Sequence, residues 1–223
     1  MSDVTCNTSR LRHSLLQPTA AIRIILAGCS DANVSRQSIE DACAVASRAA
    51  TELEGELRAL TDFLLLEYGT QKDDFGTVSL QDAIIEAVTE NPVMAPLLER
   101  VDISDPFRVM VRTEADWLQK ALAALIKNAL EFSEGPIEVK VSEDGPLAVI
   151  SITDQGIGID PEILRLVGEP FIVKHATASH RVNRMGLGLA VTSRIAKRLQ
   201  GHLDIHPHPE GGTEAVFSLP LRR

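Results

Sequence analysis

The stretch Asp154-Gln155-Gly156-Ile157-Gly158 decides how the second half of this chain is interpreted. It follows residues 148–153, an apolar segment that predicts a strand, and it precedes Ile159-Asp160-Pro161, which is typical of a helix start. A carboxylate at the end of a strand can accept a hydrogen bond from an adenine amino group, and two glycines let the backbone turn tightly beside a flat ring. An aspartate-glycine turn is also common without any such role, so the interpretation depends on the neighbouring motifs.

Two further motifs stand before and after this turn. Asn128 precedes it within residues 114–132, whose apolar spacing predicts a helix. A side-chain amide offers a neutral oxygen to magnesium beside phosphates, although alone Asn128 would be taken for a helix-surface residue. Gly186-Leu187-Gly188 follows the turn at the start of a predicted helix, whose first N–H groups favour phosphate oxygens. In this order the three motifs predict a site for ATP and magnesium.

The second glycine motif is not a dinucleotide-binding fingerprint. Val191 stands where a third glycine is required, and no predicted strand precedes Gly186. The intervening residues 170–185 are basic and aperiodic, as in an active-site lid. Their cationic side chains could neutralise a terminal phosphate, and for any single one a solvated loop position is an equally good interpretation. These side chains are Lys174, His175, Arg181 and Arg184.

The first part of the chain, residues 5–68, follows a heptad. From Leu11 to Cys29 and from Ile39 to Leu64, apolar residues recur in alternating steps of four and three, which is the pattern of a seam between helices. Residues 28–33 interrupt the pattern and predict a turn. A hairpin with one apolar stripe per helix has a poor core alone, so we expect it to form a dimeric four-helix bundle. Packing of the hairpin on its own C-terminal half is the alternative.

These periodicities divide the chain into a dimerisation domain (residues 1–68), a polar linker or hinge (69–77) and a second domain (78–223). The second domain mixes helices and strands without regular βαβ alternation, so we expect an α/β sandwich and an α+β fold class overall. Its predicted helices are 80–98, 114–132, 161–167 and 187–199, and its predicted strands are 100–104, 107–112, 137–141, 147–153, 202–206 and 214–219.

Composition restricts the function further. The 223 residues carry a net charge of −9, which argues against unspecific binding to nucleic acid or anionic membranes. No apolar run is long enough to span a bilayer, and the N-terminus lacks the apolar core of a signal peptide. Three cysteines without a C-x-x-C pair predict reduced thiols and a cytoplasmic location. A sensor, where one exists, is then expected to be a separate protein or to lie outside this sequence.

Together the motifs resemble the Bergerat-type ATP-binding domain of the sensor histidine kinases of two-component systems. Residues 125–133 resemble the family's N box, 154–158 its G1 box, 170–171 its F box, 186–189 its G2 box and 211–213 its last glycine box. The resemblance implies that Asn128 holds Mg²⁺, that Asp154 binds adenine and that Thr213 supports the base. Glu131 departs from the family, in which a lysine is usual, and removes a positive charge near the nucleotide. The nucleotide-binding set so implied is Asn128, Glu131, Asp154, Gly156, Gly158, Phe171, Lys174, Arg184, Gly186, Leu187, Gly188 and Thr213.

A second resemblance lies near the N-terminus, in His13-Ser14-Leu15-Leu16-Gln17-Pro18. His13 falls on the helix face farthest from the heptad seam, Gln17 shares that face, and Pro18 lies inside the predicted helix at a cost in stability. The segment resembles the phosphoacceptor box of histidine kinases, which implies that His13 takes the γ-phosphoryl group of ATP and passes it to an aspartate of a response regulator. Ser14 stands where an acidic residue normally orients the ring, and a hydroxyl is a poor base. Gln17 stands where a polar residue often positions water for dephosphorylation.

Three functions follow from these observations. The first is an ATP-dependent protein-histidine kinase, a homodimer with catalytic residues His13, Ser14 and Gln17 that acts on the receiver domain of a response regulator. The second is a histidine phosphotransferase or pseudokinase adaptor that relays phosphate between receiver domains. Ser14 and Glu131 favour this second function, whereas the intact nucleotide motifs argue against it. The third is an ATP-gated interaction module without phosphotransfer.

Overall fold

The computed structural model describes residues 15–16, 18–29, 35–69, 74–91, 94–104, 109–172 and 186–221. The chain divides into two compact units. The first, here called the helical unit, comprises residues 1–64 and 170–187, and the second, the sandwich unit, comprises residues 65–169 and 188–223. The predicted division into residues 1–68, 69–77 and 78–223 stays a prediction about domains that fold independently.

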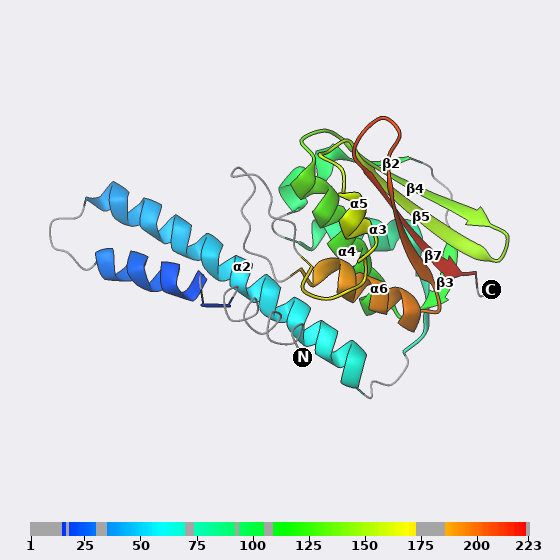
Figure 1. Ribbon diagram of the computed structural model, residues 1–223, viewed down its shortest axis with the longest axis horizontal. Coiled ribbons are helices and arrows are strands. Elements are labelled where there is room, and N and C mark those ends of the chain that lie inside the picture. Colours follow the sequence, from blue (N-terminus) through cyan, green and yellow to red (C-terminus); the bar gives the residue numbers. More distant parts are fainter. Residues whose placement is uncertain are drawn as a thin grey trace. The chain divides into compact units, whose positions relative to one another are not determined.

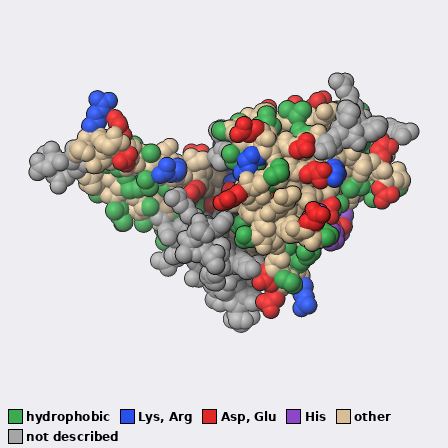
Figure 2. Space-filling view, turned by 90° about the horizontal axis from the view of Figure 1, so that it is seen from above, with side chains coloured by type: hydrophobic (Ala, Val, Ile, Leu, Met, Phe, Trp, Pro, Cys, Tyr) green, Lys and Arg blue, Asp and Glu red, His purple; other side chains and the backbone are tan. Residues whose placement is uncertain are grey.

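The helical unit carries exposed apolar side chains. Residues 18–28 are helical, and α2 spans Arg36–Tyr68 without burying any of its residues. Ile24 is 70% exposed and Leu57 is 45% exposed. Figure 2 shows hydrophobic side chains gathered along the helical part of the visible face. The described residues therefore leave part of the heptad surface uncovered, and the dimeric four-helix bundle that would cover it stays a prediction.

A five-stranded mixed sheet forms one layer of the sandwich unit. Its strands are β2 (Val101–Ser104), β4 (Ile137–Asp144), β5 (Leu147–Asp154), β6 (His202–Pro207) and β7 (Thr213–Pro220), in the order β2-β4-β5-β7-β6. β2 and β4 are parallel, and the other neighbours are antiparallel. A separate two-stranded antiparallel sheet consists of β1 (Gly76–Ser79) and β3 (Met110–Thr113).

Helices form the second layer and cover one face of the five-stranded sheet (Figure 1). Alternate residues of β5 are buried, so Ala148, Ile150 and Ile152 face this layer. The predicted α+β class and the sandwich of the second part of the chain are confirmed. The helices of the unit are α3 (Leu80–Thr89), α4 (Ala115–Phe132), the short α5 (Pro161–Leu164) and α6 (Gly188–Arg198), with a 3-10 helix, η1 (Ala95–Arg100), before β2.

α4 is the central helix of the core. It packs against α3, α6, β4 and β5, and its buried residues recur at helical spacing from Trp117 to Leu130. Just before the N-terminal end of α4, the buried Glu114 carboxylate accepts two hydrogen bonds of 2.7 Å from Arg198 of α6. The Arg198 guanidinium also lies over the Trp117 ring. This end of α4 is therefore fixed to α6 by a charged pair and an aromatic contact.

Two predictions of local structure are wrong. The helix predicted over residues 80–98 ends at Thr89, and η1 begins at Ala95. Pro92 in the sequence explains the break, because a proline lacks an N–H and disfavours an α-helical residue before it. Residues 76–77, predicted as part of the linker, belong to strand β1, which pairs only with β3 and has no long apolar run. The other elements of the sandwich unit lie within a few residues of their predicted positions.

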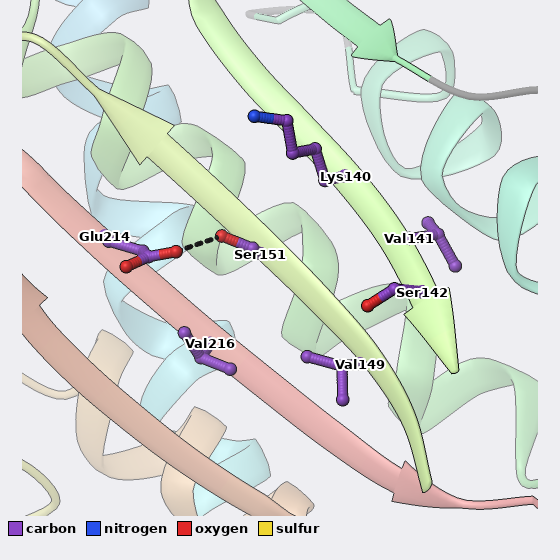
Figure 3. A pocket seen from close by; sticks show the side chains of 7 residues that line it. All are labelled: Lys140, Val141, Ser142, Val149, Ser151, Glu214 and Val216. Carbon is purple, nitrogen blue, oxygen red and sulfur yellow. Dashed lines mark hydrogen bonds between the residues drawn. The ribbon is translucent and has the colours of Figure 1, made fainter. Parts of the chain in front are cut away.

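The sheet face opposite the helices carries a shallow pocket (Figure 3). Ser151 donates a 2.7 Å hydrogen bond to Glu214 across it. Asp154 is one of the alternate, buried residues of β5 and so lies on the other face of the sheet, the face that the helices cover. In the described part of the chain, no helix is long and apolar enough to cross a bilayer. The residues that line the pocket are Lys140, Val141, Ser142, Val149, Ser151, Glu214 and Val216.

We expect Leu122→Ala to destabilise the sandwich unit strongly. Leu122 is fully buried on α4, and truncating such a leucine leaves a cavity that costs about 2–5 kcal/mol of unfolding free energy. Asp116→Ala, at an exposed position in the first turn of the same helix, should cost less than about 1 kcal/mol. Denaturant unfolding followed by circular dichroism measures both losses. Equal losses would contradict the central place of α4 in the core.

Candidate functional site

Asp154 is the last residue of β5 and is only 6% exposed. Its Oδ1 accepts a 2.7 Å hydrogen bond from the Gly156 N–H, and the carboxylate also accepts a hydrogen bond from the Thr213 N–H. Thr213 is the first residue of β7 and the cross-strand partner of Asp154. The end of one strand and the start of the next therefore hold this carboxylate in a fixed orientation.

Burial raises the pKa of the Asp154 carboxyl above its ordinary value. The hydrogen bonds from Gly156 and Thr213 and the charge of the nearby His208 lower this pKa, but desolvation is the largest contribution. Groups with such perturbed pKa values are frequent at functional sites. A further hydrogen-bond donor, such as an exocyclic amino group of a bound base, would stabilise the ionised carboxylate.

The turn after Asp154 lies against the C-terminal end of α4. The Ile157 N–H donates a 3.3 Å hydrogen bond to the Phe132 carbonyl. A Cβ on Gly156 would lie 2.0 Å from the same carbonyl oxygen, so a side chain at this position would overlap the backbone of α4. Gly156 thus permits a close approach between two backbone segments, which then set the position of the turn.

The loop between β6 and β7 forms the other side of the turn. Gly212 has a φ of +89°, and a Cβ there would lie 2.0 Å from the Asp154 carbonyl oxygen. Gly158, with a φ of +71°, also lies beside Gly212. The His208 N–H donates a 3.1 Å hydrogen bond to the Gly212 carbonyl, which closes the loop. The loop backbone therefore follows the Asp154 turn closely, and the positive φ values favour glycine at both positions.

Asn128 lies on α4, one helical turn before Phe132, and is half-buried. On the same helix the Lys127 ammonium and the Glu131 carboxylate are 4.0 Å apart, so part of the negative charge of Glu131 is offset locally. Among the described residues, no three His, Cys, Asp or Glu side chains are grouped to hold a metal ion. A magnesium ion beside Asn128 would therefore take most of its ligands from phosphates and water, which is usual for this ion in nucleotide sites.

α6 begins at Gly188. A Cβ added there would meet no described atom within 4 Å, so the described residues leave the space beside the helix start open. The first N–H groups of a helix have no partner inside it and carry partial positive charge. The start of α6 is therefore suited to a phosphate group.

Three other predicted site residues, Phe171, Gly186 and Leu187, belong to the helical unit and not to the unit that contains Asp154. The Phe171 N–H donates a 3.2 Å hydrogen bond to the Gly186 carbonyl, and both residues have positive φ values. The Phe171 ring centroid lies 6.3 Å from that of Phe63 on α2. Leu187 is buried.

Five further predicted site residues, His13, Ser14, Gln17, Lys174 and Arg184, lie outside the described residues. Their roles stay predictions. The sandwich unit thus contains Asn128, Asp154, Gly156, Gly158, Gly188 and Thr213 from the predicted set, and Glu131 lies on the same helix as Asn128.

The structure adds two residues that the sequence analysis missed. His208 acts electrostatically on Asp154, and its Nδ1 is buried without a hydrogen-bond partner among the described residues. Its place shortly before the glycine motif at residues 211–213 was the only signal in the sequence. Arg100 donates hydrogen bonds to backbone carbonyls beside the Asp154 turn, and no pattern in the sequence indicates it, because its partners are backbone atoms distant along the chain.

These groups fit an adenine nucleotide with magnesium. The buried carboxylate of Asp154 is an acceptor for the adenine amino group, and the open helix start at Gly188 offers N–H donors to phosphates. The Asn128 amide can supply one neutral oxygen to the metal ion. Each of the three chemical parts of Mg-ATP therefore has a complementary group in the sandwich unit.

Sequence comparison relates this part of the chain to known ATPases. Residues 113–223 match the family of histidine kinase-, DNA gyrase B- and HSP90-like ATPases. The chain is 28% identical over 225 residues to the sensor-like histidine kinase SenX3 of Mycolicibacterium smegmatis, an alignment that covers 98% of this chain and 57% of SenX3. It spans between 18% and 30% of the length of five other curated relatives that it matches.

Two solved structures share the fold. Full-length ShkA in complex with AMPPNP aligns with a TM-score of 0.65 and 19% identity, covering 97% of this chain and 45% of ShkA. The histidine kinase ThkA in complex with the response regulator protein TrrA aligns with a TM-score of 0.72 and 16% identity, covering 96% of this chain and 61% of that one. At these identities the likeness concerns the arrangement of helices and strands.

Gly156→Ala should destabilise the sandwich unit, whereas Gly188→Ala should not. The added methyl group at residue 156 would overlap the Phe132 carbonyl, and overpacking against a backbone costs about 1–3 kcal/mol. The methyl group at residue 188 meets no described atom, and alanine favours a helix, so stability should stay within about 1 kcal/mol of the wild type. Differential scanning calorimetry measures both changes. A Gly156→Ala variant as stable as the wild type would show that the turn does not rest on α4.

Asp154→Asn should change how stability depends on pH. Because the folded-state pKa of Asp154 is raised, its stabilising contribution is complete at acid pH and is lost as the pH rises through that pKa. Asparagine does not titrate. The melting temperature of the variant minus that of the wild type should therefore be larger at pH 7 than at about pH 4. Asp144→Asn, an exposed position on β4, controls for the loss of one negative charge. A constant or opposite difference across this range would contradict the burial of an ionised Asp154.

Proposed function

Because residues 113–223 belong to the family of histidine kinase-, DNA gyrase B- and HSP90-like ATPases, we propose that this protein is an ATP-dependent protein-histidine kinase of a two-component system. It autophosphorylates on His13 and transfers the phosphoryl group to an aspartate in the receiver domain of a response regulator. Its similarity to SenX3 over 98% of this chain supports the proposal, as does the fold that it shares with ShkA and ThkA.

The observation that carries the proposal is the buried carboxylate of Asp154. An ionised carboxylate only accepts hydrogen bonds, so it pairs with the amino group of adenine and opposes the carbonyl that guanine has at the same position. The Gly156 and Thr213 N–H groups fix its orientation before the nucleotide binds. The site is therefore preorganised for an adenine base.

The other residues of the sandwich unit take complementary roles. Asn128 contributes an oxygen ligand to Mg²⁺, and the N–H groups at the start of α6, from Gly188, bind phosphate oxygens. Thr213 supports the base beside Asp154, with which it is paired in the sheet. Gly186, Leu187 and Phe171 shape the segment before α6, and Lys174 and Arg184 neutralise the terminal phosphates.

The acceptor chemistry takes place at His13. ATP, when bound, supplies the γ-phosphoryl group. An unprotonated ring nitrogen of His13 forms the new N–P bond while the bond between phosphorus and the leaving ADP oxygen breaks. The proton on the other ring nitrogen can be hydrogen-bonded by the Ser14 hydroxyl but is not removed efficiently by it, so autophosphorylation is slow. The Gln17 amide orients water for hydrolysis of the phosphohistidine.

The partners follow from the same assignment. The helical hairpin forms a homodimer. A second copy would bury the exposed apolar side chains along α2 and the preceding helix. A receiver domain of a response regulator accepts the phosphoryl group, a proposal supported by the solved complex of ThkA with TrrA. The input comes from a separate sensor protein or from a domain outside this sequence, and the kinase acts in the cytoplasm.

A second candidate function is a histidine phosphotransferase or pseudokinase adaptor. Ser14 favours it, because it replaces the acidic residue that would act as a base. Glu131 favours it less strongly, because Lys127 offsets part of its charge. An ATP-gated interaction module without phosphotransfer would use the same nucleotide site and leave His13 unmodified.

Labelling with γ-³²P-ATP separates these functions. With magnesium, we expect a label on the wild-type protein that is acid-labile and base-stable and that is absent from His13→Ala. His13→Ala should still bind ATP, because His13 belongs to the acceptor segment and not to the nucleotide site. Label that comes from a phosphorylated receiver domain but never from ATP would support the adaptor instead. ATP binding without any label would support the interaction module.

A further inference from the structure

Arg100, the last residue of η1, donates hydrogen bonds to three backbone carbonyls at the C-terminal end of α4. Its Nη2 donates to the carbonyls of Ser133, at 2.6 Å, and Gly135, at 2.9 Å. Its Nε also donates to Gly135, at 3.3 Å, and its Nη1 to Leu130, at 3.5 Å. The last carbonyls of a helix have no partner inside it, and a cation is favourable at this end of the helix dipole. Arg100 therefore caps α4 from outside.

The same helix end supports the turn that follows Asp154. The Phe132 carbonyl accepts the Ile157 N–H and lies directly against Gly156. A Cβ on Gly135 would lie 3.7 Å from the side-chain oxygen of Gln155, so Gly135 also borders this turn. Residues 132–135 thus support the turn, and Arg100 donates hydrogen bonds to two of the four backbone carbonyls in this segment.

We propose that Arg100 is a positioning residue for base recognition: it fixes residues 132–135, and these residues fix the turn that orients the Asp154 carboxylate. This inference rests on the proposed binding of ATP at Asp154. Arg100 is expected to act through backbone atoms and not to touch the nucleotide. Loss of its contacts should therefore impair the selection of adenine and leave the phosphate-binding groups of α6 in place.

The geometry requires arginine in particular. A planar guanidinium presents several N–H donors in a rigid fork, whereas a lysine ammonium is a single point on a flexible stem. Lysine at residue 100 keeps the positive charge near the helix end but cannot reach the carbonyls of Leu130, Ser133 and Gly135 together. Arg100→Lys thus removes the positioning without removing the charge.

Arg198 provides a matched control. It is also part-buried and also donates two hydrogen bonds of 2.7 Å, but to Glu114 at the opposite end of α4. Arg198→Lys makes the same chemical change to a contact that stabilises the core and lies away from the Asp154 turn. A loss of nucleotide affinity that is caused by lower stability alone would appear in both Arg100→Lys and Arg198→Lys.

The experiment measures the affinity of the wild type, Arg100→Lys, Arg100→Met and Arg198→Lys for fluorescent MANT-ATP and MANT-GTP, well below each melting temperature. For Arg100→Lys we expect the Kd for MANT-ATP to rise about tenfold, as for the loss of one well-oriented hydrogen bond, and the Kd for MANT-GTP to change less than about twofold. The ratio of the Kd for MANT-GTP to the Kd for MANT-ATP, which measures the preference for adenine, should thus fall. Arg198→Lys should keep the wild-type ratio. Arg100→Met should lose at least as much affinity for MANT-ATP as Arg100→Lys.

Three outcomes would overturn the inference. An Arg100→Lys variant with the wild-type ratio would show that Arg100 does not orient Asp154. An equal fall of the ratio in Arg198→Lys would assign the effect to stability. A wild-type chain that binds MANT-ATP no better than MANT-GTP would overturn the proposed base recognition as well, which distinguishes that failure from a failure of Arg100 alone.

Discussion

Burial of the Asp154 carboxylate is the constraint on which the sandwich unit depends. Asp154 is a residue only 6% exposed, and removing its carboxylate from water is tolerable only where other donors replace the lost hydration. Here the donors are the backbone N–H groups of Gly156 and Thr213. Both segments must therefore lie in fixed positions, which explains the close backbone approaches at Gly156 and Gly212.

α4 connects this constraint to the rest of the fold. Its buried side chains form the centre of the core, while its C-terminal carbonyls contact the turn after Asp154. A helix packed against α3, α6 and the sheet can serve as a rigid support for the turn that follows Asp154. Two arginines attach its ends, Arg198 through the Glu114 carboxylate and Arg100 through backbone carbonyls. The same helix carries Asn128, so in the proposed function one element supports both the base and the metal ion.

The sequence predicted what depends on local pattern and residue chemistry. The periodicity of α4, β5 and β7 gave their positions, and a carboxylate between a strand and two glycines indicated Asp154. It did not predict contacts made by backbone atoms across long separations. Arg100 is 30 to 35 residues from its carbonyl partners, and the space that forbids a side chain at Gly156 is occupied by Phe132. β1 was missed because two short strands that pair only with each other need no apolar run.

In the proposed function, the departures from the histidine kinase pattern do not lie in the groups that hold the base. Glu131 is paired with Lys127 along α4, and Ser14 belongs to the proposed acceptor segment. The Asp154 carboxylate accepts hydrogen bonds from the N–H groups of Gly156 and Thr213. In the proposed function, ATP affinity and the rate of phosphotransfer therefore depend on different residues. Changes in residues 13–17 can convert a kinase into an adaptor or a nucleotide-gated module while the sandwich unit and its ATP site stay the same.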